Sequence, residues 1–220
     1  MTAENGLHDA LIDTARSLCE HGLNHSACGN VSVRCRGGML ITPSGIATDK
    51  LQSGDLVFVD LDGRWKEGRQ PSSEWLFHRD IYQRRADAGA VLHAHPAWCT
   101  TMACMRLDIP SFHYMVAMAG NSRIRCAEYA TFGTQELADH ALAALAGSKA
   151  CLLANHGLLC LEKDLQRGLD LAIEVEFLAQ VYCQSRVLGV PVLLDEPEMQ
   201  RVRERFRAYG ACKTHADRGA

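Results

Sequence analysis

Short segments with the composition of β-strands alternate along this chain with segments that have the apolar period of a helix. Strands are predicted over residues 31–35, 39–42, 56–61, 91–95, 124–129 and, with one interruption, 151–160. Helices are predicted over residues 6–20, 71–84, 97–105, 135–145, 164–187 and 196–207. Because the two kinds of segment interleave without a long linker, we expect one α/β domain that covers residues 1–220.

The composition excludes several broad classes of protein. Of the 220 residues, 47% are hydrophobic and 22% are charged, as is usual for a globular protein. The net charge of −3 gives no basic surface for nucleic acid or for an anionic membrane. No stretch approaches the ~20 apolar residues that span a bilayer, and the acidic N-terminus lacks the pattern of a secretion signal. We therefore expect a cytoplasmic protein with no nucleic-acid and no membrane partner.

The ten cysteines do not follow a metal-binding or disulfide pattern. None of them makes a C-x-x-C pair, and no secretion signal accompanies them. Most lie among Val, Leu, Ala and Ile, where a free thiol behaves as a small buried hydrophobic group. We expect most of the cysteines to fill the core.

Two histidines, His93 and His95, lie two residues apart on one predicted strand. Side chains at this spacing point to the same face of a sheet, so both imidazoles can reach one ion at about 2.0–2.1 Å. A third, His156, interrupts another apolar strand, and Gly157 beside it allows a close approach of the backbone. Three histidines with an open fourth position are typical of a catalytic zinc centre, whereas structural sites are closed by four ligands.

The alternative is that these histidines are hydrogen-bonded core residues, because an H-x-H pair alone is a weak signal. The spacing by itself leaves both interpretations open. The remaining histidines lack such a context, and we expect surface or packing roles for His8, His21, His25, His78, His113, His140 and His215.

Seven short motifs follow one another along the chain. They are Gly-Asn-Val-Ser-Val-Arg at 29–34, Met-Leu-Ile-Thr-Pro-Ser-Gly at 39–45, Pro-Ser-Ser-Glu-Trp at 71–75, His-Ala-His at 93–95, His-Tyr-Met at 113–115, Tyr-Ala-Thr-Phe-Gly-Thr at 129–134 and Asn-His-Gly-Leu at 155–158. In this order, and over about residues 20 to 180, they resemble the class II aldolase/adducin family. Several motifs in register are a more specific signal than any one of them alone.

The resemblance implies a class II aldolase-like fold, with a central, mostly antiparallel β-sheet flanked by helices. It implies one zinc ion per subunit, or another divalent metal, with Glu74 beside it as a general acid/base. The implied metal ligands are His93, His95 and His156. The implied phosphate-binding residues are Asn30, Ser44, Gly45, Ser72 and Ser73.

The resemblance also implies a homotetramer with active sites between subunits. Tyr114 would reach in from a neighbouring subunit as a catalytic residue. Tyr209 resembles a residue of the mobile C-terminal tail of such enzymes, which would begin here at about residue 208, and it is a further catalytic candidate.

Simpler roles exist for several of these residues. Glu74 could be an acid in the first turn of a helix, stabilised by the helix dipole. Ser72 and Ser73 could form an N-cap, although a helix N-terminus with flanking hydroxyls also suits a phosphate. Tyr114 could be an amphipathic core aromatic.

The activity that the resemblance implies is cleavage of a ketose 1-phosphate, such as L-fuculose 1-phosphate, to dihydroxyacetone phosphate and a short aldehyde. The nearest alternative substrates are 5-deoxyribulose 1-phosphate and 5-methylthioribulose 1-phosphate. Epimerases of the family carry a catalytic aspartate in the region matching residues 110–126, where this chain has none. Dehydratases and decarboxylases of the family share the ligand set. An adducin-like binding module is the non-enzyme alternative, although the three histidines and Glu74 are all present.

Overall fold

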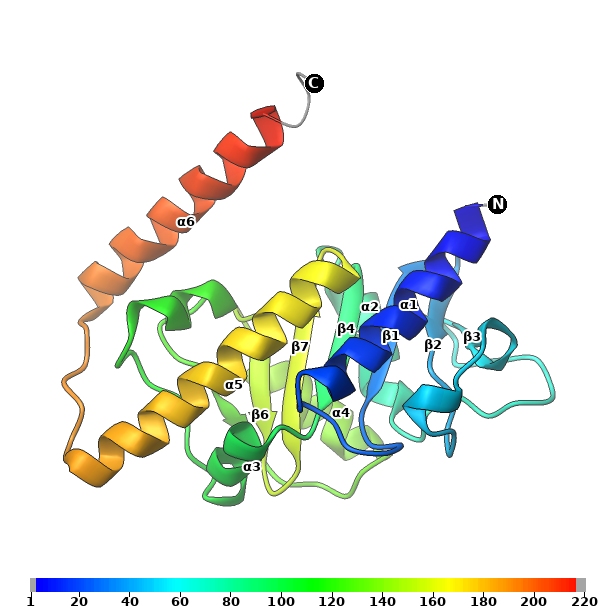
Figure 1. Cartoon of the computed structure of the whole chain (residues 1–220), viewed down its shortest axis with the longest axis horizontal. Coiled ribbons are helices and arrows are strands. Elements are labelled where there is room, and N and C mark those ends of the chain that lie inside the picture. Colours follow the sequence, from blue (N-terminus) through cyan, green and yellow to red (C-terminus); the bar gives the residue numbers. More distant parts are fainter. Residues whose placement is uncertain (1–2, 217–220) are drawn as a thin grey trace.

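The computed structural model describes residues 3–216, with the side chains of residues 6–208. In this part of the chain seven strands form one sheet, in the order β3-β2-β1-β4-β7-β6-β5 (Figure 1). They are β1 (Asn30–Cys35), β2 (Gly38–Ile41), β3 (Val57–Asp60), β4 (Ala90–Ala94), β5 (Cys126–Ala127), β6 (Ala150–Leu153) and β7 (Gly157–Glu162). Only β5 and β6 pair in parallel. The predicted single α/β domain with a mostly antiparallel sheet is confirmed.

Helices cover both faces of this sheet. They are α1 (Ala3–Glu20), α2 (Trp75–Arg84), α3 (Ala97–Cys104), α4 (Gln135–Ala144), α5 (Leu165–Leu188) and α6 (Glu196–Ala216). Helices α1, α3 and α5 contribute to the core on one face, and α2 and α4 to the core on the other. In Figure 1, α1 and α5 cross in front of the sheet, whereas α6 extends away from it.

Strand β4 lies in the middle of the sheet, and all five of its residues are buried. Alternate side chains enter opposite cores: Leu92 packs on the α1 and α5 side, and Val91 on the α2 and α4 side. Full burial of a residue such as Leu92 contributes about 1.5–3 kcal/mol. His93 shares the face of Val91, so this central strand points it toward α2, where its ring contacts Phe77.

The structure differs from the predicted elements at several places. The segment 151–160 forms two antiparallel strands, β6 and β7, because Asn155 adopts a left-handed conformation (φ 54°) that reverses the chain. The strand predicted over 124–129 is reduced to the two residues of β5. Helix α2 begins only at Trp75, and α6 continues beyond residue 207 to Ala216. The mobility of the tail stays a prediction.

The burial of the cysteines and the apolar character of the helices bear on two expectations from composition. Cys99, Cys151 and Cys160 are buried as predicted, but Cys28 and Cys104 are exposed. Among the described residues, no helix has both the length and the apolar character needed to cross a membrane.

Candidate active site

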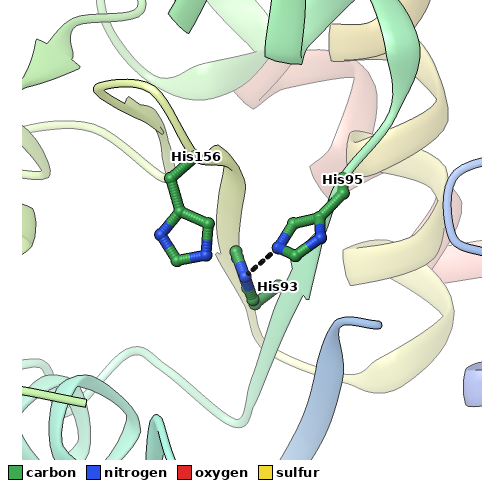
Figure 2. Close-up of side chains that lie close together, drawn as sticks. All are labelled: His93, His95 and His156. Atoms are coloured by element: carbon green, nitrogen blue, oxygen red, sulfur yellow. Dashed lines mark hydrogen bonds between the residues drawn. The ribbon is translucent and has the colours of Figure 1, made fainter. Parts of the chain in front are cut away.

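Three histidines from two separate parts of the chain meet beside the end of strand β4 (Figure 2). His93 lies on β4 and His95 directly after it, and His156 lies in the turn between β6 and β7. Their ring nitrogens lie within 4.8 Å of one another, so the cluster could hold a metal ion. Nε2 of His93 is 2.9 Å from Nε2 of His95. The structure thus brings together the residues that the sequence identifies as candidate metal ligands.

The hydrogen bonds around His93 fix which ring nitrogen carries a proton. Nδ1 donates to the carbonyl oxygen of Leu158 at 2.9 Å, because a carbonyl oxygen can only accept. Complete burial, together with the neighbouring His95, lowers the pKa of His93 to about 3, so the ring is neutral near pH 7. Nε2 therefore bears a lone pair that faces the other two rings, as in a metal-ligating histidine.

The other two histidines have lowered pKa values for the same physical reason. Burial and the neighbouring His93 lower the pKa of His156 to about 4. Burial also lowers the pKa of His95, against an opposing effect of the Glu74 carboxylate. Neutral imidazoles offer lone pairs, and this is the form in which histidine binds a metal.

Close backbone packing sets the distance between the two histidine-bearing segments. A Cβ atom at Gly157 would lie 2.4 Å from the carbonyl oxygen of Ala94 and 2.8 Å from Cδ2 of His95. Only glycine permits this approach. On the other side, the side-chain oxygen of Asn24 accepts a hydrogen bond from the backbone N–H of His95 at 2.9 Å. The position of His95 is therefore fixed by contacts on two sides.

Glu74 lies just before α2 rather than within its first turn. The helix begins at Trp75, and the Glu74 side chain does not cap it. The carboxylate points instead to the histidines, with Oε2 3.2 Å from Nε2 of His93 and Oε1 3.3 Å from Nε2 of His156. Glu74 is buried, and its Oε1 has no hydrogen-bond partner among the described residues. The simple role of a helix-start acid therefore does not explain where this side chain points.

The donor atoms of this cluster leave an electron-rich contact at its centre. The lone pair on Nε2 of His93 faces Oε2 of Glu74 at 3.2 Å, so two electron-rich atoms meet with no proton between them. Buried charges in proteins are paired or coordinate metals. A cation among three neutral nitrogens and a carboxylate would balance this arrangement, and such nitrogen and oxygen donors suit zinc. The residues present therefore fit a divalent metal.

A cavity of about 390 Å³ opens beside this cluster. Glu74, His95 and His156 form part of its lining. The residues predicted to bind phosphate line it as well: Asn30, Ser44, Gly45, Ser72 and Ser73. The backbone N–H groups of Ser44 and Ser72 donate to the carbonyl oxygens of Gln70 and Thr42, which joins the two loops.

Two details of this lining differ from the simple expectations. Ser72 does not cap helix α2, which begins at Trp75. Its Oγ accepts a hydrogen bond from the backbone N–H of Glu74, a residue that still precedes the helix. The amide nitrogen of Asn30 donates to Oε2 of Glu74 at 3.0 Å. Asn30 therefore holds the carboxylate in addition to lining the cavity.

Of the two candidate tyrosines, Tyr114 lies away from the cavity of its own chain. Tyr114 starts the short helix η3 (Tyr114–Ala119), is half exposed, and stacks on Phe206 of α6 with ring centroids 6.3 Å apart. It is absent from the cavity lining of its own chain. The side chain of Tyr209 lies outside the described residues, and its role stays a prediction.

A buried histidine behind Glu74 was missed by the sequence reasoning. His78 was expected at the surface or in packing; it is fully buried and stacks on Phe77, but its Nε2 also lies 2.5 Å from Oδ1 of Asn30, a contact that was not predicted. One feature of the sequence could have identified His78: it follows Glu74 by four residues, a spacing that places two side chains on one helical face.

Residues 9–183 match the family described as "Class II Aldolase and Adducin N-terminal domain". The chain belongs to the class II aldolase and adducin family, as its motifs predict.

Similar proteins include two kinds of aldolase. The chain is 50% identical to 5-methylthioribulose-1-phosphate/5-deoxyribulose-1-phosphate aldolase of Rhodospirillum rubrum, over 93% of this chain and 92% of the relative. It is 49% identical to L-fuculose phosphate aldolase of Escherichia coli strain K12, over 94% of this chain and 96% of the relative. A solved structure of L-fuculose 1-phosphate aldolase matches with a TM-score of 0.89 and 41% identity, over 94% of this chain and 98% of that one. The protein is thus an enzyme, an aldehyde-lyase of the class II aldolase type.

Proposed function

We propose that this enzyme cleaves a ketose 1-phosphate between C3 and C4, giving dihydroxyacetone phosphate and a short aldehyde in the cytoplasm. The observation that carries the proposal is the buried Glu74 carboxylate, which faces neutral histidines at one side of a cavity lined by hydroxyl groups. The relatives named as aldolases of fuculose and deoxyribulose phosphates support the same type of substrate.

In this proposal His93, His95 and His156 hold one zinc ion per subunit, although another divalent metal would suit the same donors. A zinc ion there supplies Lewis acidity, which stabilises the negative charge that develops as the carbon–carbon bond breaks. The hydrogen bond from His93 to Leu158 keeps the ring in the tautomer that this role needs.

Glu74 acts as the general acid/base. As the C3–C4 bond breaks, the C4 hydroxyl becomes the aldehyde carbonyl and releases its proton to solvent. The electron pair left at C3 takes a proton from the Glu74 carboxyl group, which Glu74 has gained from solvent, so one proton is released and one is taken up. The reverse transfer exchanges a C3 proton of dihydroxyacetone phosphate with solvent. Oε1 suits this task because it is not held by another hydrogen bond among the described residues. General acid/base catalysis of this kind contributes about 10²–10⁴-fold in rate.

The substrate phosphate binds in the part of the cavity lined by Ser44, Gly45, Ser72 and Ser73, with Asn30 at its inner side. Serine hydroxyls can donate to phosphate oxygens, and hydrogen bonds to a charged group are stronger than neutral ones. Gly45 has φ of 74°, a conformation that favours glycine, and no heavy atom lies within 4 Å of where its Cβ would be. This open backbone lets a phosphate approach closely.

Each active site is shared between subunits of a homotetramer, with Tyr114 supplied by a neighbour to the aldehyde half of the reaction and Tyr209 as a further catalytic candidate. The absence of Tyr114 from the cavity of its own chain agrees with this arrangement. A refolded mixture of Glu74→Gln and Tyr114→Phe chains should then regain more cleavage than the two variants refolded apart. Mixed oligomers without any recovery would reject the shared site and leave the aldolase proposal unaffected.

The experiment that tests the function is a coupled assay for dihydroxyacetone phosphate across a panel of ketose 1-phosphates. L-Fuculose 1-phosphate is the first substrate to test. The relative with 50% identity favours a second candidate, 5-deoxyribulose or 5-methylthioribulose 1-phosphate, for the same reaction. If every sugar were epimerised, dehydrated or left unchanged, with no dihydroxyacetone phosphate formed, the proposed cleavage would be wrong.

A further inference from the structure

A row of buried polar side chains leads from the Glu74 carboxylate into the protein along the contact between β1 and α2. Asn30 and Ser32 lie two residues apart on β1, so both point to the same face of the sheet. His78 and Tyr82 follow Glu74 at intervals of four residues, so they share one face of α2. All five side chains are buried.

Hydrogen bonds connect this row without a gap. Nδ2 of Asn30 donates to Oε2 of Glu74 at 3.0 Å, and Oδ1 of Asn30 lies 2.5 Å from Nε2 of His78. Nδ1 of His78 lies 2.7 Å from Oγ of Ser32, which in turn lies 2.9 Å from the hydroxyl of Tyr82. The row therefore joins the carboxylate to a tyrosine two helical turns away.

The carboxylate sets the direction of every bond in the row. Because a carboxylate accepts, the Asn30 amide must turn its NH₂ group to Glu74 and its oxygen to His78. An amide oxygen also only accepts, so His78 must carry its proton on Nε2. Nδ1 of His78 then accepts from the Ser32 hydroxyl, whose oxygen accepts from Tyr82. Burial lowers the pKa of His78 well below its ordinary value, in agreement with a neutral ring.

The far end of the row is held in place by Arg34, the next residue of β1 on the same face. Its guanidinium group lies 4.8 Å above the Tyr82 ring, and Nη2 donates to the carbonyl oxygen of Tyr82 at 2.8 Å. The same side chain donates to the carbonyl oxygen of Ala88. Tyr82 is thus fixed in place as well as hydrogen-bonded.

We propose that His78, Ser32 and Tyr82 position the Glu74 carboxylate for proton transfer, acting through the amide of Asn30. The row holds Oε2 and leaves Oε1 as the oxygen that exchanges a proton with the substrate. His78 is a positioning residue, since it contacts Asn30 rather than the cavity. This role rests on the proposed function, in which Glu74 is the general acid/base.

A matched pair of substitutions at His78 tests the proposal. The amide nitrogen of His78→Gln can take the place of Nε2 and donate to Asn30, whereas the shorter side chain of His78→Asn cannot reach it. Both variants lose the imidazole ring and its packing. A difference in kcat between them therefore reports on whether the side chain at position 78 can donate a hydrogen bond to Asn30. The measurements are kcat and KM for C3-proton exchange of dihydroxyacetone phosphate, bound metal, and the melting temperature.

His78→Asn should lose about 10²-fold in kcat, because a displacement of about 1 Å at a catalytic group has effects of this size. Its KM and metal content should match those of His78→Gln, which should keep most of the exchange rate. Equal kcat values in the two variants would overturn the positioning role. A wild-type enzyme without any exchange would instead reject the proposed function.

A spectroscopic measurement decides the proposal even if His78→Asn does not fold. In ¹⁵N spectra of the histidine-labelled full chain, a nitrogen with a lone pair is distinguished from one that carries a proton. The His78 signals, assigned by their loss in His78→Gln, should show the proton on Nε2. A proton on Nδ1 would reverse the bond to Asn30 and contradict the proposal.

Discussion

Replacing His156 by asparagine should make the stability of the metal-free protein less sensitive to acid. The pKa of His156 is lowered to about 4 in the folded protein, mainly by burial, whereas an unfolded histidine titrates near 6.5. As the pH falls below about 6.5, the unfolded chain therefore binds a proton at this residue before the folded chain does. Stability rises with pH wherever the unfolded state binds more protons, so acid must destabilise the folded state.

The magnitude follows from the difference between the two pKa values. Each pH unit between about 6.5 and 4 removes about 1.4 kcal/mol of folding free energy for this one residue. Lowering the pH from 7 to 5 should thus cost about 2 kcal/mol through His156. The side chain is only 17% exposed, so solvent screening reduces this value little. His156→Asn removes the titrating group and with it this part of the pH dependence.

The assay is urea unfolding of chelator-treated protein at several pH values between 5 and 7. The wild type should lose about 2 kcal/mol more than His156→Asn over this range, whatever the absolute stability of the variant. His25→Asn, which changes an exposed loop histidine, is the matched control and should follow the wild type. If the free energies of wild type and His156→Asn fell in parallel, burial of a neutral His156 would be refuted.

Three further predictions concern the metal, the packing and the phosphate. His95→Ala should reduce bound zinc far below one ion per chain, measured by elemental analysis, because only two of the three proposed histidine ligands remain; stoichiometric zinc would show that His95 is not a ligand. Gly157→Ala should destabilise the protein by about 1–3 kcal/mol and weaken metal binding, since a Cβ would overlap the Ala94 carbonyl. Gly54→Ala, with open space around its Cβ, should change stability by less than about 0.5 kcal/mol in the same denaturation assay. Ser72→Ala should weaken binding of phosphorylated substrate by about 1.5–3 kcal/mol and spare the unphosphorylated ketose; equal weakening would exclude a phosphate contact.

Local patterns in the sequence were sufficient to predict that the side chains of His93 and His95 lie together. His93 and His95 lie two residues apart on one predicted strand, and the period of a strand gives both side chains the same face. The structure confirms that they meet, with their Nε2 atoms 2.9 Å apart. His156 was identified for a similar reason, because a polar residue interrupts an apolar segment.

Other features depend on contacts between distant segments, which local patterns do not reveal. The reversal at Asn155 splits one predicted strand into β6 and β7, and it is this turn that carries His156 to the cluster. Ser72 and Glu74 read as a helix start because the residue types suit one. The Glu74 carboxylate instead faces His93, which lies on a distant strand, whereas the Ser72 hydroxyl keeps a local partner, the backbone N–H of Glu74.

The register between β1 and β4 connects the fold to the chemistry. Asn30 pairs with His93 across these strands, so the residue that holds Glu74 lies beside the histidine that Glu74 faces. A slip of one residue would turn every side chain of β1 to the opposite face. Asn30 and Ser32 would then leave the contact with α2, and the apolar residue Val31 would take their place against Glu74 and His78. The buried apolar neighbours that fix this register therefore also fix the position of the carboxylate, although none of them touches the cavity.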